Sequence, residues 1–480
     1  MSLARPPGAM ISCHREKTKR SNVSMQEVLN TPLSAADPAA LEQCVPSAGV
    51  LDTLAIFADV LLPTVAKGVI MRRRSVMNLA ERLQLDRRAI RRMQMIRSKY
   101  GTGPILLRLP GRRLAVVLDP RHVHRILQES PEPFATATPE KRAALAHFEP
   151  KNALISTGAE RADRRRYNEQ VLESGCAVHS LVSDFARIAD TEAARLCVHA
   201  RESGELNWQL FSDAWFRLVR RVVFGEAAAD DHELSSVMAR LRQRANWAFL
   251  APRRPELRQD LFARIEKYLN RAEQGSLAGV MAHIHATAVT EPVQQVPQWL
   301  FAFDPAGMAT FRTLALLGSH PDYARLVRSE IGAISEQLPF TRAAVLESLR
   351  LWPTTPLILR ETTEPTVWEM GTLPAQTGMV IFTPFFHRDN ERLLYADRFA
   401  PELWSNPDQP RDSAALVPFS EGPAICPGRN LVLLLASLMI TAVLENTRLR
   451  LKRPAALSAA LPLPAMLNHF NLRFELAARS

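Results

Sequence analysis

The sequence predicts a mostly helical α+β fold, in which small β-sheets lie beside a large helical bundle. Apolar residues recur every three or four positions from 120 to 331, which indicates helices through the centre of the chain. Two short apolar runs flank a Pro-Gly-Arg turn within 103–120, as in a β-hairpin. Strand-like runs return at 357–364 and 379–386. Together these elements give a helical core with small sheets at its flanks.

The 480 residues are predicted to form one large domain. A chain of this length has room for two or three average domains, but helical enzymes of this size are often a single unit with one core. Residues 1–48 mix charge with Pro, Ser and Ala, so we expect a loosely ordered lead-in there. The folded domain is expected to cover 49–480, and the sequence shows no internal repeat.

The segment 49–70 is long and apolar enough to suggest a transmembrane helix. Four residues interrupt it: Asp52, Asp59, Pro63 and Lys67. Charges in the middle of a bilayer are costly, so an amphipathic helix followed by the basic stretch "MRRR" fits better. A peripheral contact between 49–74 and a membrane surface stays an open interpretation.

The chain is strongly basic, with a formal net charge of +11 and a pI near 9.8. Arginine is dense at 71–99. Such a face fits an acidic protein, a membrane surface or nucleic acid, whereas a solvated helix surface is the simpler interpretation. No nucleic-acid-reading motif accompanies the charge, so no nucleic-acid partner is expected.

The cysteine pattern predicts a reducing compartment. The five cysteines are odd in number, form no CxxC pair and follow no secretory signal. The expected location is therefore the cytoplasm, with membrane association left open by the segment described above.

The stretch "FSEGPAICPGRNL" (419–431) places one cysteine between two glycines, directly before an apolar helix. A disulfide needs a partner cysteine, and zinc usually needs further Cys or His ligands at short spacing, but neither is nearby. Haem removes this difficulty, because the porphyrin supplies four nitrogens and a single thiolate suffices from the protein. Backbone N–H groups and the positive end of the following helix would stabilise such a thiolate. Cys426 is therefore the candidate iron ligand.

The neighbours of Cys426 fit the same interpretation. Gly422 would let the backbone turn tightly, and Gly428 would let it approach the macrocycle. Pro427 suits the first turn of the helix, and Phe419 would shield the sulfur from water.

This loop resembles that of the cytochrome P-450 superfamily, the haem-thiolate monooxygenases, whose pattern is F-x-x-G-x-R-x-C-x-G. Ala424 stands at the position of the family's arginine. A second stretch, "AVLESLRLWPTTP" (344–356), resembles the family's E-x-x-R helix through Glu347 and Arg350. The resemblance implies that this pair is a buried, structural ion lock for the cysteine-bearing segment.

The order of the motifs strengthens the resemblance. The E-x-x-R helix is followed by two strand runs, "HRD" (387–389), "ADRFAPELW" (396–404) and the cysteine loop. Leu403 stands where the family commonly has an arginine that completes the ion lock. His387 or Arg388 is the expected substitute.

A third stretch, "WLFAFDPAGMATFRTLALL" (299–317), is similar to the family's oxygen-activating helix, A/G-G-x-acid-T-T. The resemblance implies that Ala306 and Gly307 leave room over the iron and that Thr310 assists proton delivery. Ala309 replaces the usual acid. We expect Asp304 to face elsewhere.

A proline and several arginines complete the expectations for the haem site. Pro305 removes a backbone donor and is expected to kink the oxygen-activating helix near Phe301. Haem propionates need cationic donors, and arginine suits carboxylates. By resemblance these donors are Arg165 and Arg360, with Arg161 as compensation for Ala424.

The resemblance implies a soluble, bacterial-type member of the superfamily without a fused reductase. It would bind haem b (heme b, iron protoporphyrin IX) and insert one oxygen atom of O2 into an apolar small molecule. No GxxxxGK or GxGxxG nucleotide motif appears. Electrons from NAD(P)H would therefore arrive through a ferredoxin or flavodoxin and its reductase.

The missing acid keeps other functions open: a haem-thiolate peroxygenase, isomerase or dehydratase, or a non-catalytic haem-binding or partner-binding protein.

By resemblance, the substrate pocket is formed by 130–155, 245–252 and 301–310. Its aromatic candidates are Phe134, Phe148, Trp247, Phe249 and Phe301. The pairs "HVH" (122–124) and "HIH" (283–285) lack matching ligands and are expected to be packing or exposed histidines.

Overall fold

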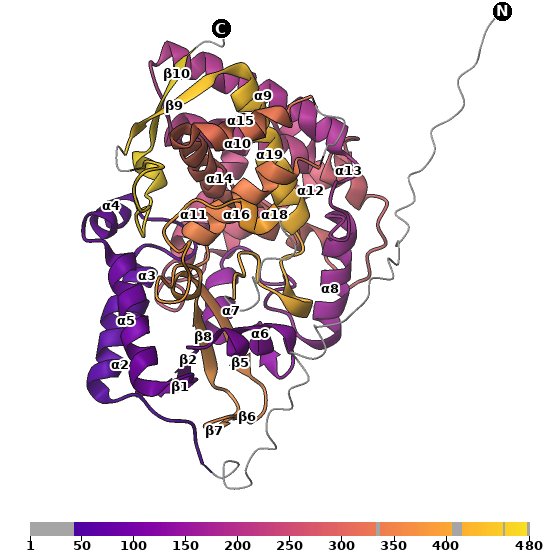
Figure 1. Ribbon diagram of the computed structural model, residues 1–480. Coiled ribbons are helices and arrows are strands. Elements are labelled where there is room, and N and C mark those ends of the chain that lie inside the picture. Colours follow the sequence, from indigo (N-terminus) through magenta and orange to yellow (C-terminus); the bar gives the residue numbers. More distant parts are fainter. Residues whose placement is uncertain (1–42, 333–336, 406–414, 455–456, 478–480) are drawn as a thin grey trace, which may run out of the picture.

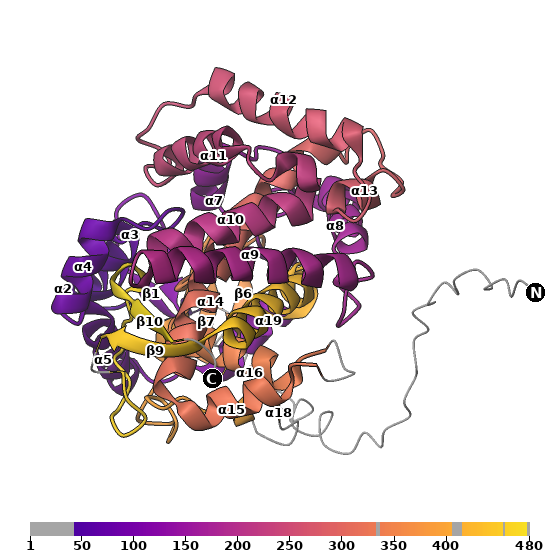
Figure 2. The ribbon, with the colours of Figure 1, turned by 90° about the horizontal axis from the view of Figure 1, so that it is seen from above.

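The computed structural model describes residues 43–332, 337–405, 415–454 and 457–477. Figure 1 shows the helical bundle on one side, the sheet containing β2, β5 and β8 beneath it, and the N-terminal helices beside that sheet. Figure 2, seen from above, shows α11 and α12 on one side of the bundle and α15 and α18 on the other. Most of the predicted lead-in, 1–42, lies outside the described residues.

Helices account for most of the described chain. The N-terminal group comprises α2 (Val50–Ile56), a π-helical turn (Phe57–Leu61), α3 (Leu62–Ala66), α4 (Arg74–Arg82) and α5 (Leu85–Tyr100). The bundle and its flanks comprise α6 (Pro120–Gln128), α7 (Pro139–Leu145), α8 (Gly158–Val171), α9 (Val182–Glu202), α10 (Trp208–Phe224), α11 (His232–Ala245), α12 (Pro255–Arg271), α13 (Leu277–Met281), α14 (Val296–Ser319), α15 (Pro321–Ser329), α16 (Pro339–Leu351), α17 (Thr383–His387), α18 (Glu402–Ser405) and α19 (Arg429–Asn446).

The largest sheet has five strands in the order β1-β2-β8-β5-β3. Its strands are β1 (Ile105–Leu107), β2 (Leu114–Val116), β3 (Phe134–Ala135), β5 (Leu357–Thr362) and β8 (Gly378–Phe382). The predicted hairpin is present, since β1 and β2 pair antiparallel, and β2 then pairs parallel with β8. The strand run at 357–364 forms β5, and the first part of the run at 379–386 forms β8, which pairs with β5. The second part of that run was predicted wrongly, because α17 begins at Thr383.

Two small sheets were not anticipated. One joins β4 (Leu206–Asn207), β10 (Arg473–Ala477) and β9 (Arg448–Arg453), and the other joins β6 (Thr366–Trp368) and β7 (Gly371–Leu373). β4, β6 and β7 have only two or three residues, too few alternating positions for a period-2 pattern to be recognised. β9 is longer, but its sequence RLRLKR is mostly charged and largely exposed, so it lacks a run of apolar residues.

The centre of the bundle is α14, which packs against α10, α16 and α19. Apolar side chains on all sides explain its position, because a helix that is hydrophobic all round has to be buried. The last long helix, α19, is apolar and long enough to cross a membrane by composition alone, but 72% of it is buried inside the protein. It is a core helix in this fold.

The ordered part of the chain begins earlier than residue 49. Val45 and Ala48 are buried, and the Ala48 N–H donates to the Leu106 carbonyl oxygen at 2.8 Å. Residues 43–48 were expected in the lead-in but belong to the folded part, where Cys44 bridges to Thr372 of β7 and Ser47 to Leu106 of β1. Isolated bridges of this kind leave no pattern in the sequence.

The arginine-rich stretch at 71–99 is folded into α4 and α5, as the simpler interpretation required. Several of its arginines form ion pairs within the protein. Arg92 pairs with Asp59 at 2.8 Å, and Arg97 pairs with Asp389 and Glu391. Part of the positive charge in this stretch is thus used to join α5 to neighbouring segments.

Candidate functional site

The cysteine loop is a tight turn held by its own backbone. Gly422 opens a short 3₁₀ turn with φ of +66°, a conformation that favours glycine, and a Cβ there would collide with the Leu127 carbonyl oxygen. The Cys426 N–H donates to the Phe419 carbonyl oxygen at 2.9 Å. α19 begins at Arg429, three residues after Cys426, and its N-terminal end carries partial positive charge.

Burial raises the pKa of the Cys426 thiol above its usual value. Three groups act in the opposite direction: the Gly428 N–H, which hydrogen-bonds the sulfur, and the positive charges of Arg165 and Arg429. Each of them stabilises the thiolate relative to the thiol. The surroundings of the sulfur therefore suit an anionic metal ligand, and a bound metal would supply the remaining positive charge.

Gly428 has ordinary backbone angles, so it is not needed for a left-handed turn. A Cβ at this position would contact only Leu172, at 3.9 Å. The predicted role of Gly428, close approach of a flat group, stays a prediction. Phe419 is half-buried and packs against the main core.

The three predicted propionate arginines gather near the cysteine loop. Arg360, on β5, donates to Ser420 Oγ of the loop at 3.2 Å and to Ser130 Oγ at 2.9 Å. Burial and the charge of Arg161 lower the pKa of Arg360 to about 10. Arg165 lies near enough to act on both Arg161 and Cys426, although it also pairs with Glu169.

Lys141, on α7, belongs to the same cationic group and was missed by the sequence analysis. Its ammonium donates to the carbonyl oxygens of Thr136 (3.0 Å) and Leu359 (2.9 Å). Burial and then the charge of Arg360 hold its pKa well below the usual value. A lone lysine in "TPEKRAAL" carries no motif, so only the packing of α7 against β5 reveals it.

The residues present fit a haem group. Arg360 and Lys141 have hydroxyl and carbonyl partners, and no ion pair with a carboxylate is seen for them or for Arg161 in the described part of the chain. Such cations suit the two propionates. Among the described residues no cluster of His, Cys, Asp and Glu could hold a metal. A metal bound by Cys426 must therefore bring its other ligands with it, as porphyrin iron does.

The E-x-x-R pair forms a fully buried, bidentate ion pair. Arg350 Nη2 lies 2.6 Å from Glu347 Oε1, Arg350 Nε lies 2.8 Å from Glu347 Oε2, and both side chains are 0% exposed. Arg350 also donates to four carbonyl oxygens in the segment that leads to the cysteine loop, those of His387, Tyr395, Ala396 and Arg398. The pair thereby fixes this segment to α16.

Backbone and indole donors complete the lock in place of the arginine missing at Leu403. The Ala400 N–H donates to Glu347 Oε1 and the Trp404 indole N–H to Glu347 Oε2, both at 2.9 Å. The expected substitutes were wrong. The lock uses only the backbone carbonyl of His387, and Arg388 pairs with Asp397 instead.

The oxygen-activating helix corresponds to α14, which is continuous from Val296 to Ser319 and contains Pro305. The Thr310 hydroxyl donates to the Ala306 carbonyl oxygen at 2.8 Å. Gly307 faces a different neighbour from the one expected: a Cβ on it would lie 2.7 Å from Trp215 of α10. Gly307 therefore allows close helix packing, and its predicted role of leaving room over the iron stays a prediction.

Asp304 faces away from Thr310, as expected. Its carboxylate forms an ion pair with Arg242 of α11. Ala309, at the position of the usual acid, offers only its carbonyl oxygen, which accepts from the Thr313 hydroxyl at 2.8 Å. No ionisable side chain stands next to Thr310 on this helix.

The predicted aromatic pocket residues divide into three groups. Phe148 and Phe301 pack edge to face, with ring centroids 5.6 Å apart. Phe134 is buried in the core of the five-stranded sheet, and Trp247 and Phe249 are 54% and 71% exposed. Only the first pair remains a candidate for the pocket wall.

Glu149, next to Phe148, is a fully buried carboxyl that sequence reasoning missed. The Gln298 amide nitrogen donates to its two oxygens at 2.7 and 3.0 Å. Burial raises the pKa of Glu149 well above its usual value, while the charge of Arg242 acts in the opposite direction. A single Glu in "HFEP" gives no signal by itself, because its burial comes from the packing of the 146–152 loop against α14.

A model of the cytochrome P-450 family matches residues 293–465, which include the oxygen-activating helix, the E-x-x-R pair and the cysteine loop. Cyclooctat-9-en-7-ol 5-monooxygenase of Streptomyces melanosporofaciens is 32% identical over 176 residues, 33% of this chain and 38% of that protein. Cytochrome P-450 4g15 of Drosophila melanogaster is 28% identical over 179 residues, 33% of this chain and 30% of that protein. The chain thus matches 30–38% of these relatives' length.

Solved structures extend the likeness to most of the chain. The retinoic-acid-bound cyanobacterial CYP120A1 superposes with a TM-score of 0.65 at 18% identity, covering 80% of this chain and 94% of that one. CYP175A1 of Thermus thermophilus has a TM-score of 0.60 at 21% identity, covering 84% and 98%. The architecture is the cytochrome P-450 fold. The likeness in sequence to the family model is confined to 293–465, whereas the likeness in fold covers at least 80% of the chain.

Proposed function

We propose that this protein is a haem-thiolate monooxygenase that inserts one oxygen atom of O2 into an apolar small molecule. The observation that carries the proposal is the Cys426 loop, with a hydrogen-bonded sulfur before α19 and the cations Arg161, Arg360 and Lys141 nearby. Haem b, when bound, supplies an iron that activates dioxygen, and its thiolate ligand favours O–O cleavage. Cys426 would be that ligand, and the cations would hold the propionates.

The remaining chemistry falls to side chains of α14 and the loop before α8. Thr310 Oγ1 holds a proton that it directs to the Ala306 carbonyl oxygen and that it could donate to a polar group held beside α14. Ala306 and Ala309 present small, apolar side chains beside it. Phe148 and Phe301 would exclude water and favour an apolar substrate.

Separate redox partners would supply the electrons, and an acidic ferredoxin or flavodoxin suits the surface beside the cysteine loop. Arg429 is exposed there. The pKa of the neighbouring Arg342 is lowered mainly by burial and also by the positive charge of Arg429. Two close positive charges favour an acidic partner. Reduction by such a partner should therefore slow as ionic strength rises, and a rate independent of salt would contradict electrostatic docking.

A peroxide-dependent or O2-independent reaction is the second candidate, and one observation favours it. Ala309 occupies the acid position, and Asp304 is already paired with Arg242. A peroxygenase, isomerase or dehydratase does not need an O2-linked proton relay.

Product formation with reduced redox partners and with peroxide alone distinguishes these candidates. A spectral titration first identifies compounds that change the absorption of the haem-loaded protein. Product is then measured with NAD(P)H plus a surrogate ferredoxin and reductase, and separately with hydrogen peroxide alone. The monooxygenase proposal expects substrate-dependent NAD(P)H oxidation with product. Product formed with peroxide alone, or without any oxidant, would reject the monooxygenase proposal and support the second candidate.

A contact between 49–74 and a membrane surface is also proposed. Apolar side chains on α2, α3 and the turn between them are exposed, including Leu51 (82%), Leu54 (59%) and Leu62 (52%). Arg74 is exposed nearby, which suits anionic headgroups. The protein should float with vesicles containing phosphatidylserine, and L51E/L54E should stay in the unbound fraction. Flotation that is unchanged in this variant would reject the contact.

A further inference from the structure

A cavity of about 370 Å³ lies on the side of α14 that faces away from Thr310. It is enclosed by side chains of α10, α11 and α14, together with the segments around Met71 and Phe470. Its α14 residues are Leu300, Asp304 and Met308, spaced four apart on one helix face. Because each helical residue turns by about 100°, Met308 points roughly 160° away from Thr310. The cavity is thus separate from the site built around Cys426.

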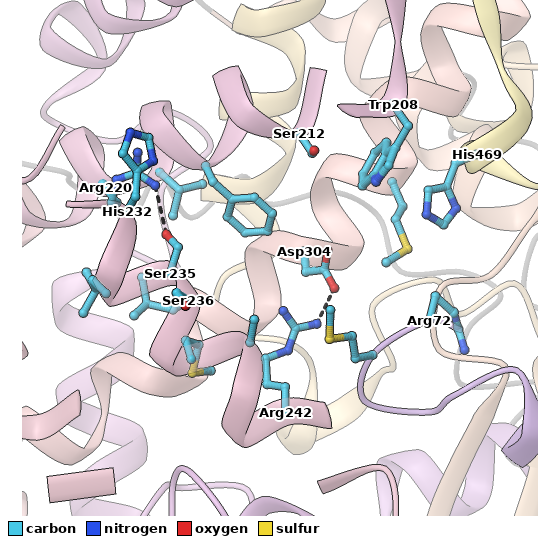
Figure 3. A pocket seen from close by; sticks show the side chains of 18 of the residues that line it. Arg72, Trp208, Ser212, Arg220, His232, Ser235, Ser236, Arg242, Asp304 and His469 are labelled. Atoms are coloured by element: carbon cyan, nitrogen blue, oxygen red, sulfur yellow. Dashed lines mark hydrogen bonds and ion pairs between the residues drawn. The ribbon is translucent and has the colours of Figure 1, made fainter. Parts of the chain in front are cut away.

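The cavity has the size and lining of a small-molecule site. Such sites measure roughly 300–1,000 Å³ and combine apolar walls with a few polar groups. Figure 3 shows Arg220, His232, Ser235 and Ser236 gathered at one end and Arg72, Trp208 and His469 at the other, with Asp304 and Arg242 between them. Both His232 and Ser236 are exposed, so the first end opens toward solvent, whereas His469 at the second end is 0% exposed.

Polar atoms at the inner part of the cavity lack partners. Both ring nitrogens of His469 and the Nε of Arg242 are buried without a hydrogen bond in the described part of the chain. Buried donors and acceptors are normally satisfied, so such groups mark a place where a ligand is expected. His469 packs edge to face on Trp208 with ring centroids 4.4 Å apart, which holds its imidazole in place.

The charges around the cavity favour an anion. Three arginines line it against one carboxylate, and only Arg242 forms an ion pair with that carboxylate, Asp304. Arg72 donates to the Gly68 and Thr354 carbonyl oxygens, and Arg220 to carbonyl oxygens and the Ser235 hydroxyl. Neither shows an ion pair within the described residues, so the lining carries a buried positive excess.

We propose that this cavity is a second small-molecule site, which binds a monocarboxylate with an apolar body. The carboxylate lies at the inner end, near Arg72, Arg242 and His469, and the apolar body lies along Phe216, Val219 and Met308 toward the opening. Burial and the charges of Arg312 and Arg72 hold the pKa of His469 well below its ordinary value. A neutral imidazole keeps one N–H to donate, and the same positive charges attract the carboxylate.

Calorimetric titration of the haem-loaded protein with decanoate and with 1-decanol tests this site. Imidazole is present at saturating concentration, so that the iron is occupied. Decanoate is expected to bind at least tenfold more tightly than 1-decanol. Equal affinities would overturn the carboxylate assignment, and decanoate binding seen only without imidazole would place the ligand at the haem instead.

Matched variants locate the binding. Ala239→Phe fills the cavity from α11, and Gln243→Phe adds the same ring at an exposed position one turn further along that helix. His469→Phe keeps the aromatic packing and removes the ring nitrogens. A239F and H469F should each weaken decanoate binding at least tenfold, whereas Q243F should not. Unchanged affinity in A239F, with the thiolate spectrum of haem retained, would overturn the second site and leave the proposed function intact.

Discussion

Glu347 and Arg350 show how a commonplace spacing acquires its role through burial. On a surface, a Glu and an Arg three residues apart contribute little to stability. Here both are 0% exposed, and six further hydrogen bonds from the surrounding chain satisfy their remaining atoms. The pair stabilises the fold only while both members are present, because either charge alone would be buried without compensation.

Removal of the Glu347 carboxylate should therefore destabilise the protein severely. Glu347→Ala is expected to lower the free energy of unfolding by roughly 3–5 kcal/mol, since it leaves a buried guanidinium unpaired. Urea unfolding followed by circular dichroism measures this. The control is Asp322→Asn, which breaks the exposed Arg325 pair (74% and 81% exposed) and should change little. Equal effects of the two variants would contradict a structural lock.

Thr310 should affect coupling more than stability. Its hydroxyl bonds to the Ala306 carbonyl oxygen of its own helix, so Thr310→Ala breaks no hydrogen bond to another element of the described chain. We expect product formed per NAD(P)H oxidised to fall several-fold in T310A and to recover in Thr310→Ser. Both variants lose the same buried methyl group, so their unfolding free energies should fall by a similar amount, about 1 kcal/mol. A T310A variant that converts NAD(P)H to product as efficiently as the parent would exclude a proton-delivery role.

His387 should make stability depend on pH. Burial and the charge of Arg350 lower its pKa from 6.5 to about 3, and its Nε2 accepts the Val417 N–H at 3.0 Å. The folded protein thus binds this proton less readily than the unfolded chain. The free energy of unfolding should therefore fall as pH drops from about 6.5 toward 3, by up to about 1.4 kcal/mol per pH unit.

Comparison with His387→Gln isolates this contribution from other titrating groups. The difference in unfolding free energy between parent and variant should be constant above pH 7 and should shrink as the pH falls below 6.5. A difference that does not vary with pH would show that His387 does not titrate in this way.

At the scale of elements, helix packing assigns roles that motif spacing could not. Gly307 belongs to the predicted oxygen motif, yet it serves the contact between α14 and α10. Trp215 lies against it and donates from its indole N–H to the Phe303 carbonyl oxygen at 2.7 Å. A sequence motif records which residue types recur, but the face that each residue presents depends on the neighbouring helices.

This contact predicts a steric effect. In Gly307→Ala the new Cβ would lie 2.7 Å from Trp215, so the helices must separate, at a cost of about 1–3 kcal/mol in unfolding free energy. Gly175→Ala is the control, because a Cβ there meets nothing within 4 Å. Thermal unfolding compares the two variants. A neutral G307A variant would indicate that α10 and α14 are less tightly packed than described.

The segment that joins α16 to the cysteine loop illustrates what sequence could and could not provide. The order of its motifs could be predicted, because each motif combines particular residue types at fixed spacing. The hydrogen-bond partners of Glu347 could not be predicted. Ala400 contributes a backbone N–H and Trp404 an indole N–H, and neither resembles the missing arginine. An arginine can be expected as a hydrogen-bond donor from its residue type, but a backbone N–H of an alanine cannot, because every residue except proline has one.

At the scale of the whole molecule, long periodic segments were predicted well and short or isolated ones were not. The central helices and the hairpin follow from apolar spacing, which burial enforces along many residues. Glu149, Lys141 and the α10–α11–α14 cavity arise where segments far apart in sequence meet, so no local pattern encodes them. The same reason explains why Trp247 and Phe249, aromatic but exposed, were assigned to the pocket in error.

The whole account depends on Cys426 as the ligand of porphyrin iron, and one spectrum tests it most directly. The haem-reconstituted protein is reduced, treated with carbon monoxide and compared with Cys426→His prepared in the same way. We predict the red-shifted Soret band typical of a thiolate ligand in the parent protein and a band typical of an imidazole ligand in the variant. A thiolate-type band that persists in Cys426→His would contradict the assignment.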